Sequence, residues 1–324
     1  MKLEGFLRAL GAPAQSAEEE TFELFAQDLP SQSLGFVDPK APALDLTIGG
    51  RDLTIHQSPA VLSSNRAGGT TGAVVWKITP SFAEWISSPS ANNPFFAHGI
   101  LSSDSVVLEL GCGVSGLVGV LLGPRISRYV LTDQPYVAKL VEQNVAENQG
   151  SASASASISA KTTRPPKSTT ALGKQRATTP NAAAPRRGGE PGVGRVRFTP
   201  LDWETDEVTP DLLTRAGETA KKSFDAVLAC DCIYNEALIE PFISTCVDIC
   251  RLRTAASDEG EPCICVVAQQ LRDHLVFEAW MSRFAESFHV WRVPDELLLE
   301  GLRSNSGFVV HVGVLREVIS VEGR

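Results

Sequence analysis

Long apolar runs are missing from this sequence, and none approaches the roughly 18 residues that a membrane-spanning helix needs. Its first twenty residues, MKLEGFLRALGAPAQSAEEE, carry charge from Lys2 onward and do not have the apolar centre of a secretory leader. Positive charge is also scarce, because 29 Lys and Arg stand against 38 Asp and Glu. We therefore expect a cytoplasmic protein, and the net negative charge of the chain as a whole is not that of a nucleic-acid-binding protein.

Histidine is sparse as well. The five histidines are scattered, and none stands beside a serine or cysteine in a known nucleophile motif, so hydrolase chemistry is disfavoured. Cysteine is present in an odd number, seven, mostly inside apolar runs, which favours reduced, buried thiols. We expect no metal site. Zinc held by the two C-x-C pairs, in ACDC and PCIC, is the alternative, but that spacing is uncommon for zinc.

The chain changes character near residue 105. Before it, residues 43–59 alternate around Gly49-Gly50 and predict a β-hairpin. After it, strand-like and helix-like segments alternate, which predicts a mostly parallel sheet covered by helices on both faces. The expected strands are 105–110, 128–133, 194–203, 224–234, 262–270, 289–294 and 307–316; the expected helices are 114–123, 134–148, 235–253 and 273–288.

The predicted fold is α/β, a Rossmann-like seven-stranded sheet whose last two strands pair antiparallel at one edge. Residues 1–104 are expected to form an N-terminal extension, with the hairpin and a helix, that packs on a domain of residues 105–324. Residues 149–194 interrupt this domain with a stretch that is rich in Ser, Ala, Pro and Thr and has no aromatic residue. We interpret 149–194 as a disordered insertion. Its seven basic residues against one Glu leave an RNA-binding arm as the alternative.

The segment ELGCGVSG, where a predicted strand meets a predicted helix, fits G-x-G-x-x-G. This pattern alone is weak, since nicotinamide-dependent dehydrogenases use it too. Glu109 stands two residues before Gly111, where a carboxylate would repel a pyrophosphate and attract a cationic cofactor. A cationic cofactor is therefore favoured over a dinucleotide. A nicotinamide-dependent dehydrogenase is the alternative, and binding of NADH in a titration would support it.

Two later strand ends extend this pattern. Asp133 follows Gly111 by 22 residues, the place of a carboxylate that binds ribose hydroxyls. Trp203 follows the next strand, where an adenine could lie against the indole. A ribose, an adenine and a cationic tail without phosphate describe S-adenosyl-L-methionine, which we expect to be the cofactor.

Several segments resemble one enzyme family in order: GAVVWKI, VLELGCGVSGLVG, YVLTDQPYVAKLVEQNVAEN, LDWE and FDAVLACDCIYNE. The chain is similar to the seven-strand protein-lysine methyltransferases of the methyltransferase-16 group, above all to their fungal ribosomal-protein branch. The match covers roughly residues 43–148 and 195–315. It implies S-adenosylmethionine-dependent methylation of a lysine, with a large-subunit ribosomal protein as substrate. We also expect a monomeric enzyme, and ribosomal RNA is the contact that the basic charge of 149–194 would favour.

The resemblance also assigns roles to residues. Cofactor-binding positions are Trp76, Gly111, Cys112, Gly113, Asp133, Trp203 and Cys230, to which the charge argument adds Glu109. The family's D-x-x-Y becomes Asp231 and Tyr234, at the mouth where the acceptor lysine enters, and these are the candidate catalytic residues. The family more often has G-x-G-x-G, whereas Ser115 stands at the third position here.

Three questions stay open at this level. A methyltransferase of the same fold could act on another protein, a nucleic acid or a small molecule, although DCIY in place of an N-P-P-Y-like motif favours lysine. A catalytically idle scaffold for ribosome assembly is the non-enzymatic alternative. Neither the target lysine nor the number of methyl groups follows from the sequence.

Overall fold

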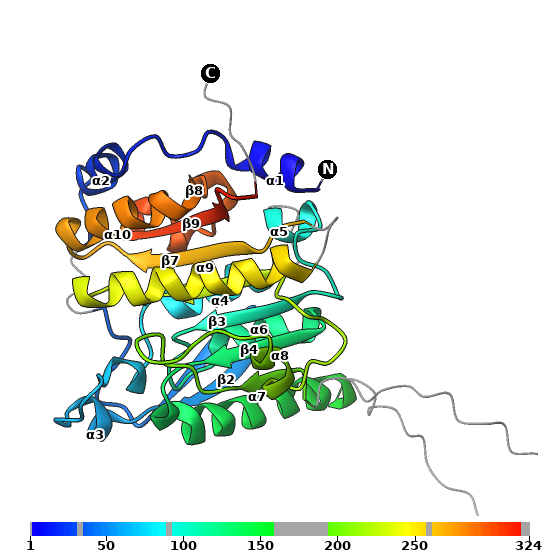
Figure 1. The fold of residues 1–324 in the computed structure, drawn as a ribbon. Coiled ribbons are helices and arrows are strands. Elements are labelled where there is room, and N and C mark those ends of the chain that lie inside the picture. Colours follow the sequence, from blue (N-terminus) through cyan, green and yellow to red (C-terminus); the bar gives the residue numbers. More distant parts are fainter. Residues whose placement is uncertain (1, 31–34, 89–92, 159–193, 257–260, 319–324) are drawn as a thin grey trace, which may run out of the picture.

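The computed structural model describes residues 2–30, 35–88, 93–158, 194–256 and 261–318 (Figure 1). The N-terminal part contains α1 (Lys2–Leu10), α2 (Ala17–Phe25), β1 (Ala43–Ile48), β2 (Arg51–His56), α3 (Pro59–Leu62), α4 (Ile78–Ser87) and α5 (Pro94–Ala97). The predicted hairpin is confirmed, with Ile48 paired to Arg51. Gly49 and Gly50 both have positive φ, +57° and +74°, as a tight two-residue hairpin turn requires.

The second part is built on a seven-stranded sheet. Its strands are β3 (Val106–Leu110), β4 (Arg128–Thr132), β5 (Val196–Phe198), β6 (Ala226–Cys230), β7 (Ile264–Gln270), β8 (Phe288–Arg292) and β9 (Phe308–Leu315). Their spatial order is β5-β4-β3-β6-β7-β9-β8. The pairs from β5 to β7 are parallel, and β9 runs antiparallel to both β7 and β8. The predicted Rossmann-like sheet with an antiparallel pair at one edge is thus confirmed.

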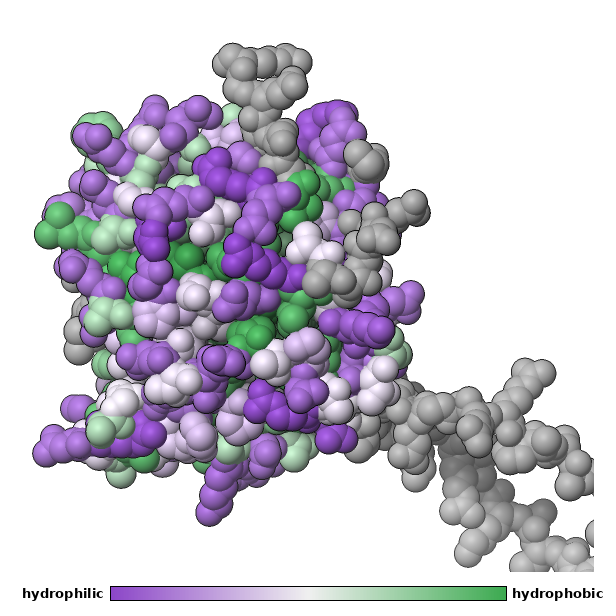
Figure 2. All heavy atoms as spheres, viewed as in Figure 1, coloured by the Kyte–Doolittle hydropathy of each residue, from purple (hydrophilic) through white to green (hydrophobic). Residues whose placement is uncertain are grey.

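Helices cover both faces of this sheet. The helices that follow β3 are α6 (Leu117–Leu122), α7 (Ala138–Ile158), α8 (Asp211–Arg215), α9 (Ile239–Ala256) and α10 (His274–Ser287). One apolar core joins the sheet to α4, α6, α7 and the hairpin, and a second joins it to α2, α8, α9 and α10. Figure 1 shows α9 lying across the sheet. Figure 2 shows mostly hydrophilic side chains on this side of the molecule.

Alternation along the strands explains the two cores. On β3, Val107 faces one core while Val106 and Leu108 face the other, so every strand residue is buried. A strand covered on both sides reads as a continuous apolar run. Glu109 breaks that run, and it lies on the side of Val107.

Some boundaries differ from the expectation. Helix α6 begins at Leu117 rather than at 114, because Gly116 precedes it in a left-handed conformation, φ +56°. Strand β5 ends at Phe198, although the Thr199 and Leu201 N–H groups still donate to the Leu131 and Asp133 carbonyls at 2.9 and 3.1 Å. Helix α7 continues to Ile158, into the segment expected to be an insertion. The rest of that segment, 159–193, lies outside the described residues, so its expected disorder stays a prediction.

All seven cysteines are unpaired and buried, as predicted. Cys246 and Cys250 on α9 hydrogen-bond with Cys265 and Cys263 of the β7 segment, so these thiols belong to the packing of α9 on the sheet. Within the described residues, no three or more His, Cys, Asp and Glu side chains are grouped so that they could hold a metal ion. Among the helices that the structure describes, none is both long and apolar enough to span a membrane.

Candidate active site

A cavity opens at the carboxyl ends of β3, β4 and β6. The chain leaves β3 in one direction to β4 and β5 and later returns on its other side as β6 and β7, so β3 and β6 form the switch point where ligands bind in such sheets. The cavity holds about 850 Å³ of space, part of it open to solvent. All ten site residues predicted from the sequence line it: Trp76, Glu109, Gly111, Cys112, Gly113, Asp133, Trp203, Cys230, Asp231 and Tyr234.

The glycine turn after β3 is pressed against protein neighbours. Gly111 has φ +66°, and a Cβ added there would lie 2.6 Å from the Cys232 Sγ. Gly113 has φ +59°, and a Cβ would lie 3.0 Å from the Gly72 carbonyl oxygen. Both positions therefore need glycine for conformation and for space.

The amides of this turn are already bonded within the protein. Cys112 N–H donates to the Thr132 carbonyl at 3.0 Å and Val114 N–H to the Gly72 carbonyl at 2.8 Å. Gly113 N–H donates to Asp133 Oδ2 at 2.9 Å. The turn is thus held in place by its neighbours before any ligand arrives.

Glu109 is a buried carboxyl group at the inner end of the cavity, with 2% of its surface exposed. The Tyr129 hydroxyl donates a hydrogen bond of 2.7 Å to Glu109 Oε2. Burial raises the pKa of Glu109 to about 8, against a smaller opposing effect of this hydrogen bond. No cationic side chain in the described part of the chain forms an ion pair with Glu109, so a cationic ligand would stabilise the ionised form of this carboxyl group.

Asp133 follows β4 at the same edge of the sheet. Its Oδ1 accepts from the Gln134 N–H at 2.7 Å, and its Oδ2 accepts from Gly113. Burial raises the pKa of Asp133 to about 6, and the two amide hydrogen bonds act in the opposite direction. The carboxylate keeps lone pairs for further donors, such as ribose hydroxyls.

Two tryptophans line the cavity. Trp203 contacts Phe242 edge to face, with ring centroids 5.8 Å apart, and its ring lies beside Gly111. The centroid of the Trp76 ring is 4.5 Å from the centroid of the Phe36 ring and 4.8 Å from the Arg272 guanidinium carbon. The Trp76 indole N–H donates to the Thr71 carbonyl at 3.1 Å, which fixes the ring in the wall.

Asp231 follows β6 and is the one residue other than glycine with positive φ, +61°, in the described part of the chain. Such a conformation costs about 1–2 kcal/mol in a residue with a side chain, less for Asp and Asn. Arg272 binds both carboxylate oxygens, Nη1 to Oδ1 at 2.7 Å and Nη2 to Oδ2 at 2.5 Å. The Gln270 N–H adds a third bond to Oδ1 at 3.2 Å. The side chain of Asp231 is 1% exposed, so this is a buried ion pair.

Tyr234 lies at the rim with 40% of its surface exposed. Its hydroxyl and the Thr71 Oγ1 are 3.2 Å apart. Burial of its inner part raises the pKa of the phenol, which stays neutral at pH 7. Burial likewise raises the pKa of the Cys112 and Cys230 thiols well above the ordinary value, so neither is a ready nucleophile.

Sequence reasoning missed several lining residues. Thr71, Gly72 and Tyr136 line the cavity, and Arg272 pairs with Asp231 beside it. Arg272 carried a usable signal, because it comes soon after a buried parallel strand and such strand ends meet at one edge. Thr71 and Gly72 precede the tryptophan of VVW and carried no signal of their own.

The chain is similar to several known proteins. A family model described as lysine methyltransferase matches residues 56–163. A Zygosaccharomyces rouxii protein named ribosomal lysine N-methyltransferase 5 is 32% identical over 246 residues, which cover 72% of this chain and 70% of that protein. A Schizosaccharomyces pombe protein named diaminohydroxyphosphoribosylamino-pyrimidine deaminase is 28% identical over 276 residues, 85% of this chain and 52% of that protein.

Among solved structures, a putative SAM-dependent methyltransferase from Streptococcus mutans aligns with a TM-score of 0.41 at 8% identity, covering 85% of this chain and 56% of that one. The chain spans about half the length of the fission yeast relative and 70% of the Zygosaccharomyces one. The 32% identity over more than two thirds of both this chain and the Zygosaccharomyces protein, together with the family match, shows that the chain belongs to the lysine methyltransferase family.

Proposed function

We propose that the protein is an S-adenosyl-L-methionine-dependent protein-lysine N-methyltransferase of the cytoplasm that modifies a ribosomal protein of the large subunit. The observation that carries this proposal is the cavity itself, where Glu109 and Asp133 end neighbouring strands around a glycine turn. A buried carboxyl group without an ion-pair partner suits a cofactor that carries positive charge.

The residues present fit S-adenosylmethionine, which supplies an electrophilic methyl group when bound. Asp133 would accept hydrogen bonds from the ribose hydroxyls, and Trp203 would flank the adenine. Glu109 would lose its proton and balance the positive charge of the methionine part. An ionised Glu109 would repel a pyrophosphate, which supports this cofactor over a dinucleotide.

The other half of the cavity would receive the lysine. A lysine amine must be neutral to attack, and its ordinary pKa of about 10.4 lies well above neutral pH. The half-exposed Tyr234 offers its hydroxyl and ring face at the entrance. Asp231, whose charge is compensated by Arg272, would orient the amine through a remaining lone pair rather than act as a strong base.

The substrate class is supported by the names of relatives. The Zygosaccharomyces protein is named a ribosomal lysine methyltransferase, and the sequence resemblance adds the large subunit. Methylation of another protein, a nucleic acid or a small molecule by the same fold is the alternative. A monomer, and an RNA contact through 149–194, stay predictions.

The test is a transfer assay with radiolabelled S-adenosylmethionine on ribosomes from cells that lack the enzyme, followed by mass spectrometry of the labelled protein. Label on a lysine of a large-subunit protein is the expected result. Binding of the cofactor without transfer to any ribosomal fraction would favour the idle scaffold, and binding of NADH instead would favour a dehydrogenase.

A variant of Tyr234 separates binding from transfer. Tyr234→Phe keeps the ring and removes the hydroxyl that meets Thr71. We expect cofactor affinity within threefold of the wild type and transfer at least tenfold slower, because the loss falls mainly on the transition state. Unchanged transfer would place the acceptor lysine elsewhere.

A further inference from the structure

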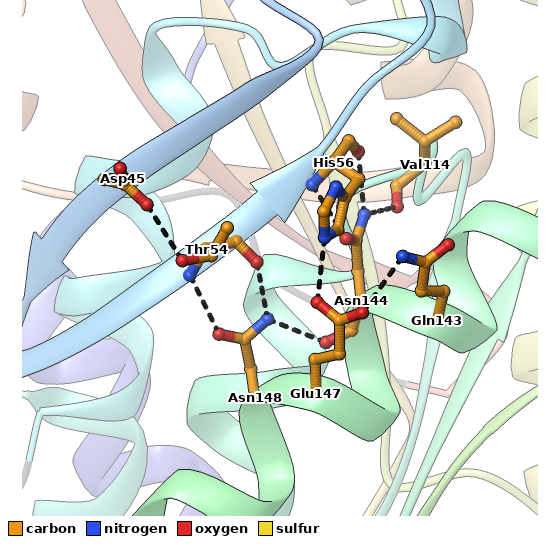
Figure 3. Close-up of polar contacts among 8 residues, drawn as sticks. All are labelled: Asp45, Thr54, His56, Val114, Gln143, Asn144, Glu147 and Asn148. Atoms are coloured by element: carbon orange, nitrogen blue, oxygen red, sulfur yellow. Dashed lines mark hydrogen bonds and ion pairs between the residues drawn. The ribbon is translucent and has the colours of Figure 1, made fainter.

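Two asparagines on α7 bind the free edge of the hairpin in the same way (Figure 3). Asn144 Oδ1 accepts from the His56 N–H at 2.8 Å, and its Nδ2 donates to the His56 carbonyl at 2.9 Å. One turn further along the helix, Asn148 makes the same pair of bonds with Thr54, at 3.1 and 2.9 Å. Each side-chain amide thus takes the place of a neighbouring strand for one residue of β2.

The two asparagines differ in their third hydrogen bond. The second Nδ2 hydrogen of Asn148 goes back to its own helix, to the Asn144 carbonyl at 2.8 Å. That of Asn144 leaves the helix and reaches the Val114 carbonyl at 2.7 Å. Val114 is the residue that follows Gly113, so this bond ends on the glycine turn of the cavity.

Val114 is held from two sides as a result. Its carbonyl accepts from Asn144, and its N–H donates to the carbonyl of Gly72, which lines the cavity. Asn144 is fully buried, and so is its bond to Val114. A lost partner in such a place leaves a buried polar group unsatisfied, so its neighbours shift to recover the bond.

We propose that Asn144 is a positioning residue for the cofactor site. It fixes the Val114 carbonyl, and through it the position of the glycine turn relative to Asp133 and Gly72. Asn148 stabilises the hairpin but has no hydrogen bond to the turn. The reference to a cofactor rests on the proposed function, whereas the coupling between Asn144 and the turn does not.

The experiment compares Asn144→Asp with Asn148→Asp. Each change keeps the size and the acceptor oxygen and removes both donated bonds, so both variants should lose thermal stability. Hydrogen exchange is then measured on the ligand-free protein over residues 112–116. We expect the amides of Gly113 and Val114 to exchange at least tenfold faster in Asn144→Asp and within twofold of the wild type in Asn148→Asp. Equal acceleration in both variants would overturn the proposal.

Two further measurements complete the test. If either Asp variant does not fold, Asn144→Ala and Asn148→Ala are compared in the same way, since they remove the bonds without placing a carboxylate among carbonyls. Calorimetry with S-adenosylhomocysteine should show at least tenfold weaker binding for the Asn144 variant and a change within threefold for the Asn148 variant. A wild type that does not bind this ligand would overturn the proposed function alone, while the exchange rates would still decide the role of Asn144.

Discussion

The cavity has two halves, which differ in whether an arginine forms an ion pair with their carboxyl groups. At the ends of β3 and β4, Glu109 is buried and Asp133 is half-buried, neither in an ion pair, and burial raises the pKa of these groups to about 8 and about 6. At the ends of β6 and β7, Asp231 is buried as well, but Arg272 binds both of its oxygens. The first half could therefore pair with a cationic ligand, while the negative charge in the second is already paired within the protein.

This difference separates the residues expected to bind the ligand from those expected to stabilise the fold. Uncompensated carboxyl groups cost stability, and a fold keeps them where a ligand repays the cost. The compensated pair fixes Asp231 in a left-handed conformation and holds the Arg272 guanidinium against the Trp76 ring. Loss of the Asp231–Arg272 pair should therefore affect folding first, and substitutions of Glu109 or Asp133 should affect binding first.

The largest effect on stability is expected from removal of the ion pair between Arg272 and Asp231. Arg272→Gln leaves Asp231 charged, buried and unpaired, which should lower the free energy of unfolding by about 3 kcal/mol. Chemical denaturation measures this loss. The matched control is Arg251→Gln, whose exposed pair with Glu317 should be worth less than about 1 kcal/mol. Equal losses in the two variants would show that the Asp231 pair does not stabilise the fold.

The first half is tested with Asp133→Ala. Loss of the bonds that the carboxylate would make to ribose should weaken S-adenosylmethionine binding more than tenfold, or about 1.5–3 kcal/mol. Calorimetry gives the dissociation constant. Asp104→Ala, at an exposed carboxylate near the opposite end of β3, should leave it unchanged. An unchanged constant in the Asp133 variant would contradict the ribose assignment.

A pH series sharpens the comparison. Glu109 has a raised pKa, about 8, so it is mostly protonated at pH 6.5, and a cationic ligand prefers its ionised form. Affinity for S-adenosylmethionine should therefore rise with pH between 6.5 and 7.5, by up to about tenfold per unit. Glu109→Gln should flatten the profile. A flat profile in the wild type would mean that Glu109 does not face the positive charge of the ligand.

The smallest effect is expected far from both halves. Replacing residues 159–193 with a short Gly-Ser linker should leave the melting temperature and cofactor affinity as they are, because we expect the segment to be a disordered insertion. A melting temperature lowered by more than about 5 °C, which means more than 1 kcal/mol, would show that it packs on the domain. Activity lost on ribosomes but kept on isolated substrate protein would support the RNA-binding arm.

The sequence predicted the sheet and the cavity lining well, for physical reasons. Buried parallel strands are continuous apolar runs, and side chains just after them meet at one edge, which is how Glu109, Asp133 and Asp231 could be placed together. The partners of these groups could not be predicted in the same way. The place of Arg272 after a buried strand indicates the same edge, but its pairing with Asp231 is not encoded locally. Asn144 acts through a contact with a residue far away in the chain, and no local pattern distinguishes such a side chain from a solvated one.

The hairpin illustrates a different consequence. A two-stranded sheet leaves the outer edge of each strand unpaired, and backbone donors and acceptors on such edges can pair with another chain and promote aggregation. On β2, Asn144 and Asn148 occupy the outward groups of His56 and Thr54, so a passing strand would find them already bonded. Two amide side chains on a neighbouring helix thus satisfy backbone groups of an edge that the sheet itself leaves unpaired.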